Sequence, residues 1–204
     1  MALNKNNDWT GNSHSTFVCL GASNHTEKER ETNDYYATDP HSLIIFLEKL
    51  KQDGIVLNRN IWECACGGGH LSKVLENGGY NVLSSDKVDR GYGIIKDFLT
   101  CDDKFDGDIL TNPPYAYAKQ FVETALNKVN IGNRVIMLLK IQFLESKSRK
   151  LLFDKSPPKY VYVNSERQLC SMNGNFEKYT ASALCYCWFV WEKGYKGETI
   201  VRWI

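Results

Sequence analysis

The fold is decided by the stretch Ile61-Trp62-Glu63-Cys64-Ala65-Cys66-Gly67-Gly68-Gly69-His70. Its first six residues are mostly apolar, as in a buried strand, and three glycines follow them directly. Leu71, Val74 and Leu75 then recur at helical spacing, until Gly78-Gly79 ends the segment. A strand, a glycine turn and a helix in this order predict the opening of a β-α-β unit.

Strands and helices alternate along the rest of the chain. A helix is expected to start at Thr38-Asp39-Pro40, with Thr38 as its cap, and to run to about Lys51. Further helices are expected near 121–126, ending before Gly132, and over 146–153. After the first strand, the expected strands cover 80–84, 93–95, 105–111, 134–139, 160–163 and 183–191.

This alternation predicts an α/β fold with a doubly wound, mainly parallel sheet of seven strands and helices on both faces. No convincing helix separates the last two expected strands, so we expect them to form an antiparallel hairpin at one edge of the sheet.

The length of 204 residues suits one domain with an additional arm. Residues 1–34 are rich in Asn, Ser, Thr and charge, which favours a polar and partly disordered N-terminal arm before a domain over 35–204. The net charge of +1 indicates nothing about a nucleic-acid partner. The sequence shows no signal-peptide core and no apolar run of about eighteen residues, so we expect a cytoplasmic protein without a membrane partner.

Seven cysteines include two pairs with C-x-C spacing, Cys64/Cys66 and Cys185/Cys187. Both pairs lie in expected buried strands, and the C-x2-4-C spacing typical of zinc sites is absent. We expect buried thiols and no metal site.

Three expected strand ends carry residues suited to a nucleotide-like cofactor. The glycine turn has G-x-G but Ser72 where a dinucleotide site would place its third glycine. Asp86 can accept bonds from ribose hydroxyls, and Asp97-Phe98 offers a carboxylate and a ring for an adenine. Each feature has a structural alternative, namely a plain turn, a solvated acid, or a cap beside a core ring, and NAD fits the first two as well.

The most specific stretch is Asn112-Pro113-Pro114-Tyr115, which follows an expected strand. Two prolines make a stiff turn. The Asn112 side-chain oxygen and the Pro113 carbonyl can each accept one N–H of a planar amine, while Tyr115 offers a flat face for stacking. Acceptance of both N–H groups would direct the nitrogen lone pair toward an incoming methyl group. If the methyl donor is a sulfonium, it is already activated, so positioning of the two reactants would supply much of the rate of methyl transfer.

With this motif the chain resembles the class I S-adenosylmethionine-dependent methyltransferases of the N6-adenine type, in particular small methylases of bacteriophages and prophages. The resemblance also covers 33–40, Phe143-Leu144-Glu145 and Trp188-Phe189-Val190-Trp191-Glu192-Lys193-Gly194. It implies a Rossmann-like fold, S-adenosylmethionine as cofactor and Asn112, Pro113, Pro114 and Tyr115 as catalytic residues. The cofactor-binding residues that it implies are Tyr36 and Thr38 beside the methionine part, Glu63, Cys66, Gly67 and Gly69 in the first motif, Asp86 for the ribose, and Asp97 and Phe98 for the adenine.

Two features depart from the family. Cys64 stands where proline is frequent, at an expected buried position. The chain also leaves no room for a separate target-recognition domain. This leaves open relaxed specificity, a separate specificity subunit or an RNA substrate, with DNA preferred over RNA.

Basic residues after the fifth expected strand could contact a phosphate backbone. The candidates are Lys140, Lys147 and Arg149, together with Arg167 in a long connection. The alternative is a solvated helix face.

Three other functions remain open at this point. The same turn could methylate a glutamine side-chain amide of a protein, although the arm is short and polar for a substrate domain. The chain could be a cofactor-binding module without catalysis in a larger complex, which the intact tetrapeptide disfavours. An NAD oxidoreductase would leave Asn112-Pro113-Pro114-Tyr115 unexplained.

Overall fold

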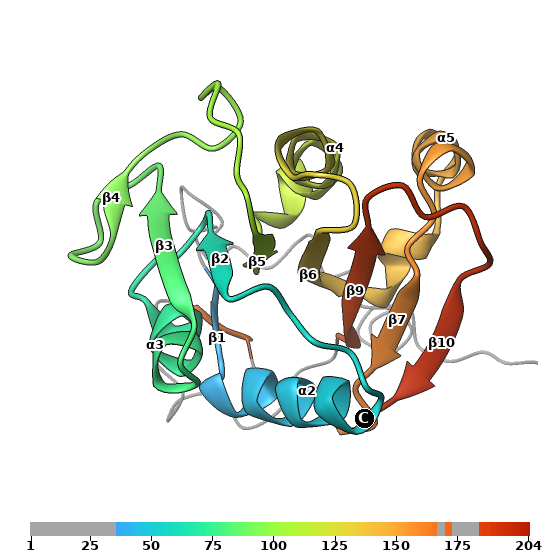
Figure 1. The fold of residues 1–204 in the computed structure, drawn as a ribbon, viewed down its shortest axis with the longest axis horizontal. Helices are drawn as coiled ribbons and strands as arrows, with labels where there is room; N and C mark the ends of the chain where they lie inside the picture. The colour runs from blue at the N-terminus through green and yellow to red at the C-terminus, as the bar shows by residue number, and fades with distance from the viewer. Residues whose placement is uncertain (1–35, 167–169, 173–183) are drawn as a thin grey trace, which may run out of the picture. The chain divides into compact units, whose positions relative to one another are not determined.

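The computed structural model describes residues 36–166, 170–172 and 184–204. Within these ranges, eight strands form one sheet in the order β10-β7-β9-β6-β5-β2-β3-β4 (Figure 1). The strands are β2 (Asn60–Glu63), β3 (Asn81–Asp86), β4 (Ile94–Ile95), β5 (Asp108–Thr111), β6 (Arg134–Lys140), β7 (Tyr160–Val163), β9 (Tyr186–Glu192) and β10 (Ile200–Trp203). Strand β9 runs antiparallel to both of its neighbours, and the other pairs in the sheet are parallel.

Helices cover both faces of this sheet (Figure 1). Helices α2 (Pro40–Gln52) and α3 (His70–Asn77) lie on one face, and α4 (Ala118–Lys128) and α5 (Lys147–Lys155) lie on the other. Two short 3-10 helices, η1 (Tyr115–Tyr117) and η2 (Ile141–Leu144), follow β5 and β6. This arrangement confirms the α/β fold with helices on both faces.

Each face of the sheet has its own apolar core, and β9 contributes to both. Cys187, Phe189 and Trp191 belong to the core that contains Phe121 of α4, while Trp188 and Val190 join the core of α2 and α3. Successive side chains of a strand point to opposite faces, so a strand covered on both sides is apolar throughout.

The expected strand count and the expected edge were wrong. The sheet has eight strands, because Ile200–Trp203 adds β10 beside β7. The predicted antiparallel pair exists as β7 and β9, but β9 lies between β6 and β7 rather than at the edge. Strand β9 is almost entirely buried and therefore takes an internal place, whereas the half-exposed β10 forms the edge.

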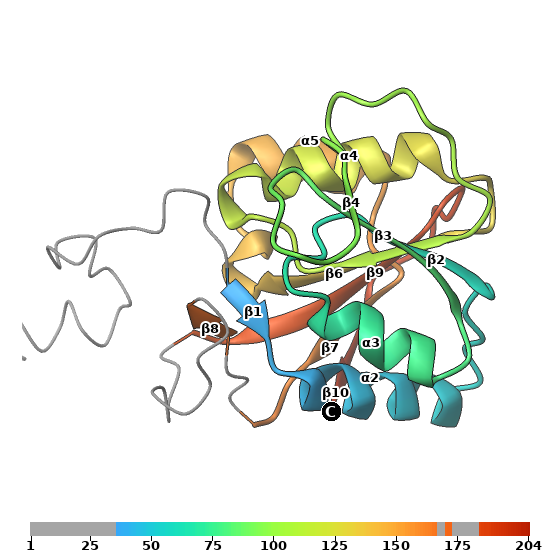
Figure 2. The same cartoon turned by 90° about the vertical axis from the view of Figure 1, so that its left-hand side faces the viewer.

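A small antiparallel sheet precedes α2. It pairs β1 (Tyr36–Thr38) with β8 (Cys170–Met172), and Figure 2 shows the two strands side by side. Thr38 was predicted to cap α2, but it is the last residue of β1 instead. Asp39 is the cap: its Oδ1 accepts a hydrogen bond of 2.9 Å from the His41 backbone N–H, and Pro40 opens the helix.

Two further expectations differ or lie outside the described ranges. The strand predicted from residue 105 begins only at Asp108, and Phe105 forms an isolated bridge with Val129. The predicted arm over 1–34 falls outside the described residues. Among the helices that are described, none has the length and apolar character needed to cross a membrane.

Candidate active site

The parallel strands bring the motif residues to one edge of the sheet. Strand β2 ends at Glu63, β3 ends at Asp86, and β5 ends at Thr111, directly before Asn112. The register pairs Glu63 with Ser84, so the ends of β2 and β3 lie together. Open α/β sheets bind ligands at this carboxyl edge.

The glycine turn and Asp86 are joined by a hydrogen bond. The Gly67 backbone N–H donates to Asp86 Oδ2 at 2.9 Å, and the Val88 N–H donates to Asp86 Oδ1 at 2.9 Å. These two bonds orient the carboxylate at the turn. The tertiary structure thus brings together the first two predicted cofactor motifs.

Tyr92 is a residue of this region that sequence reasoning missed. A Cβ built on Gly69 would lie 2.5 Å from carbons of the Tyr92 ring, and Gly69 has a φ of +79°. The Tyr92 hydroxyl donates to Glu76 Oε1 at 2.9 Å on α3. Only a glycine permits this close approach of the ring to the turn. The available signal was the placement of Tyr92 between Gly91 and Gly93.

The two members of the predicted adenine pair have different surroundings. Asp97 Oδ2 lies 2.9 Å from the Lys87 ammonium, whose hydrogen bond lowers the pKa of the Asp97 carboxyl. The Phe98 ring is 2% exposed and stacks on Phe121 at a centroid distance of 5.2 Å. Phe98 therefore packs as a core residue and has almost no surface for a ligand, whereas the partly exposed Asp97 can reach one.

The Asn112-Pro113-Pro114-Tyr115 turn is held from two directions. The Asn112 Nδ2 atom donates a hydrogen bond of 2.8 Å to the Thr38 hydroxyl oxygen. The Tyr115 ring packs 5.8 Å from the ring of the buried Tyr186, and the Lys140 ammonium lies 4.7 Å from the Tyr115 centroid. Thr38, predicted beside the cofactor, thus contacts the predicted catalytic residue directly.

Glu63 lies at the end of β2, between the glycine turn that follows it and Thr111, which directly precedes the Asn112-Pro113-Pro114-Tyr115 turn. Its side chain is 1% exposed, and its Oε1 accepts a hydrogen bond of 2.6 Å from the Thr111 hydroxyl. Ser72 Oγ lies 3.5 Å from Glu63 Oε2 and accepts a hydrogen bond from Ser84. Burial raises the pKa of Glu63 to about 8, so the carboxyl is largely protonated at neutral pH. Glu63 is therefore placed to hold both turns rather than to contact a ligand directly.

The predicted phosphate contacts have unequal surroundings. Lys140 lies beside Tyr115, and Lys147 is exposed at the start of α5. Arg149 donates from Nε to the Glu145 carbonyl at 2.7 Å and from a terminal nitrogen to the Gln142 carbonyl at 3.0 Å. The Arg149 guanidinium therefore stabilises η2 and the residue after it. Arg167 lies outside the described residues.

The described part of the chain has no group of three or more His, Cys, Asp or Glu side chains that could hold a metal ion. Five of its cysteines are free thiols, namely Cys64, Cys66, Cys101, Cys185 and Cys187, and Cys64, Cys66 and Cys187 are buried.

Comparison with solved structures places this geometry in a known fold. The chain is similar to a protein of Listeria monocytogenes designated a class I S-adenosylmethionine-dependent methyltransferase, with a TM-score of 0.58, 15% identity, and coverage of 93% of this chain and 71% of the other. The fold is that of the class I methyltransferases. This confirms the expected Rossmann-like class I methyltransferase fold.

Two further solved structures are similar to this chain. One is designated an RNA methyltransferase of Pyrococcus horikoshii, with a TM-score of 0.59, 12% identity, and coverage of 88% of this chain and 98% of the other. The other is designated a modification subunit of a type I restriction enzyme from Vibrio vulnificus, with a TM-score of 0.54, 12% identity, and coverage of 91% and 49%. No protein-family model matches the chain, and the comparison with curated proteins found no match.

Proposed function

We propose that the chain transfers a methyl group from S-adenosylmethionine to the exocyclic N6 amine of adenine in nucleic acid, with DNA as the preferred substrate over RNA. The observation that carries the proposal is the position of Asn112-Pro113-Pro114-Tyr115 at the carboxyl end of β5, beside the glycine turn at the end of β2. The class I methyltransferase fold binds its cofactor and substrate at this edge of the sheet.

The residues at the ends of β2, β3 and β4 fit this cofactor. The Asp86 carboxylate, oriented by two backbone N–H groups, suits the ribose hydroxyls, and Asp97 suits the adenine amine. Gly67 carries no Cβ and has a positive φ, so a ligand could approach the backbone of the turn closely there. When bound, S-adenosylmethionine would supply an activated methyl group.

The catalytic turn suits a planar amine. Asn112 Oδ1 and the Pro113 carbonyl would accept the two N–H groups, which directs the nitrogen lone pair out of the amine plane. Tyr115 would stack on the base, and its ring is held against Tyr186. The buried Glu63 would keep the two turns in register through Thr111. Orientation of the reactants would then provide much of the acceleration.

Adenine in DNA is the substrate favoured by the resemblance to small phage methylases. The solved structures designated an RNA methyltransferase and a restriction modification subunit are compatible with a nucleic-acid substrate. A base inside a duplex would have to be flipped out to reach Asn112. Sequence specificity would come from relaxed recognition or from a separate specificity subunit.

The test uses isotopically labelled S-adenosylmethionine with unmethylated DNA or RNA, followed by digestion and mass spectrometry of the nucleosides. We expect label in N6-methyladenine with the wild-type protein and none with Asn112→Ala. Asn77→Ala, an exposed asparagine at the end of α3, is the matched control and should keep full activity. Cofactor binding without label in either polymer would contradict the proposal and favour a glutamine amide as substrate, or a binding module without catalysis.

A further inference from the structure

The Asn112 side chain is hydrogen-bonded to a residue 74 positions earlier in the chain. Its Nδ2 atom donates to Thr38 Oγ1 at 2.8 Å, and Thr38 is 3% exposed. Thr38 is itself held on both sides. Its backbone pairs with that of Cys170 in the β1–β8 sheet. The next residue, Asp39, is the N-cap of α2.

The orientation of this amide determines what Asn112 can do. A side-chain amide has an acceptor end and a donor end, which differ only by a rotation of about 180°. An amine that is to be methylated presents N–H donors, so it requires the oxygen end. The nitrogen end would place donor against donor. Because the nitrogen is directed at Thr38, the oxygen is directed away from it.

We propose that Thr38 is a positioning residue that fixes the Asn112 amide with its oxygen toward the substrate amine. This role rests on the proposed function and differs from the cofactor contact that the resemblance implies for Thr38. The small β1–β8 sheet would then serve the catalytic turn, because it places the threonine hydroxyl against the amide.

The kinetic test compares three variants. Thr38→Val removes the hydroxyl at nearly constant volume, and Thr38→Ser keeps it. Thr199→Val is the matched control, because the Thr199 hydroxyl donates one hydrogen bond of 2.8 Å to the Pro158 carbonyl far from Asn112 in the sequence. We expect Thr38→Val to lower kcat about 10- to 100-fold, with little change in the Kd of S-adenosylmethionine. Thr38→Ser and Thr199→Val should stay within about threefold of the wild type.

Two kinetic outcomes would overturn the inference. One is an unchanged kcat in Thr38→Val. The other is a weaker Kd for S-adenosylmethionine with kcat preserved, which would make Thr38 a cofactor contact instead.

A second readout does not depend on turnover. In ¹⁵N-labelled protein, the side-chain amide pair of Asn112 is assigned by its absence from Asn112→Ala. We expect slow hydrogen exchange for this pair in the wild type and in Thr199→Val, and a shifted, faster-exchanging pair in Thr38→Val. An unchanged pair in Thr38→Val would refute the positioning role. If the wild type methylates nothing, the proposed function fails, and the amide exchange still decides whether Thr38 holds Asn112.

Discussion

The Thr111 hydroxyl donates a 2.6 Å hydrogen bond to Glu63 Oε1. This bond joins the strand that leads into the glycine turn to the strand that leads into the Asn112 turn. The two residues are 48 positions apart, and both are buried. The Glu63 carboxyl thus adds a side-chain link between the ends of two strands that are also paired through their backbones, one leading to the predicted cofactor site and the other to the predicted catalytic site.

Replacing Glu63 with glutamine should change how stability depends on pH. The Glu63 carboxyl has an ordinary pKa of 4.5 and a folded pKa of about 8. Between these values the folded protein keeps a proton that the unfolded chain has lost, so stability falls as pH rises and levels off above about 8. We expect the wild type to lose on the order of 3 kcal/mol more than Glu63→Gln between about pH 5 and about pH 8.

Urea unfolding of both proteins at several pH values measures this difference. Glu48→Gln, an exposed glutamate on α2, serves as the control and should track the wild type. Parallel pH profiles for Glu63→Gln and the wild type would show that Glu63 titrates normally.

Gly69→Ala should be more destabilising than Gly79→Ala. Both glycines have a positive φ, +79° and +85°, so alanine strains the backbone at either site. At Gly69 the new methyl group would also meet the Tyr92 ring at 2.5 Å, whereas Gly79 has no atom within 4 Å. We expect Gly69→Ala to cost about 1–3 kcal/mol more, measured by chemical denaturation.

The double variant Gly69→Ala/Tyr92→Ala separates the two effects. If the ring causes the extra cost, removing it should bring the alanine penalty at residue 69 close to that at residue 79. A penalty that stays the same would mean that Tyr92 is not the obstacle.

Asp86→Asn should weaken the binding of S-adenosylmethionine. The carboxylate is oriented by the N–H groups of Gly67 and Val88, and an amide cannot present two equivalent acceptors. We expect the Kd from titration calorimetry to rise roughly 10- to 100-fold. Asp89→Asn is the matched change, because Asp89 accepts a backbone bond from Gly91 in the same loop. Equal Kd values for both variants would remove Asp86 from the cofactor site.

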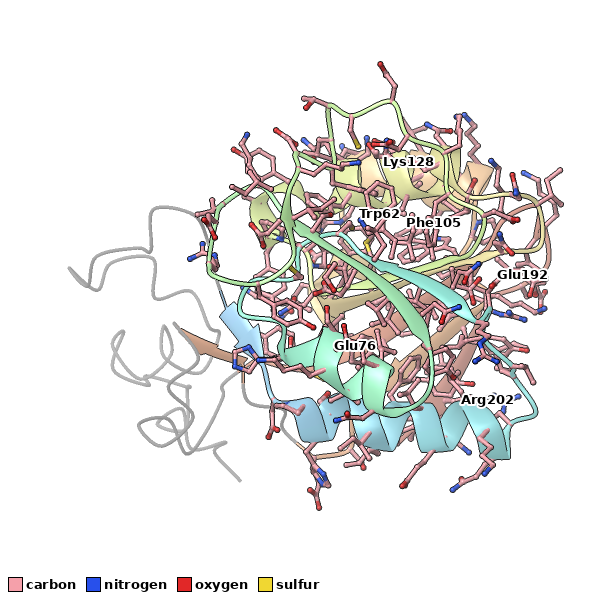
Figure 3. The ribbon with its side chains drawn as sticks, turned by 60° about the vertical axis from the view of Figure 1, so that its left-hand side comes forward. Trp62, Glu76, Phe105, Lys128, Glu192 and Arg202 are labelled. Carbon is pink, nitrogen blue, oxygen red and sulfur yellow. The ribbon has the colours of Figure 1, made fainter. Side chains whose placement is uncertain are left out.

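Lys128→Met should loosen the segment that follows Asp97. Figure 3 shows Lys128, the last residue of α4, close to Trp62 and Phe105. The buried ammonium lies 5.9 Å from the Trp62 ring centroid and donates to the carbonyls of Cys101 and Asp103. Without it those carbonyls lose a charged donor, and we expect a loss of about 1–3 kcal/mol in unfolding free energy.

Lys104→Met provides the comparison for Lys128. The Lys104 ammonium also donates to a carbonyl, that of Asn127 at 3.0 Å, but in an exposed position. Its replacement should leave the denaturation midpoint nearly unchanged. Similar midpoints for the two variants would show that the buried ammonium adds no stability.

Local patterns in the sequence predicted much of this protein. The apolar run before Gly67 predicted a strand, the three glycines predicted a turn, and the spacing of the apolar residues after them predicted a helix. These predictions succeeded because burial and glycine conformations depend on neighbouring residues in the chain. Alternation of such units predicted the parallel part of the sheet, since connections that cross over a sheet return the chain in the same direction. The Asn112 turn followed from the two prolines alone.

Only the tertiary structure decided which segments are neighbours. An apolar strand such as β9 indicates burial but not which strands flank it, so its place between β6 and β7 was not predictable from its own residues. Phe98 packs in the core, where its ring stacks on that of Phe121. Asn112 donates a hydrogen bond to Thr38, because the fold brings the end of β1 beside the turn. These are contacts between residues far apart in the chain, and the periodicity of a sequence records burial without recording the partner.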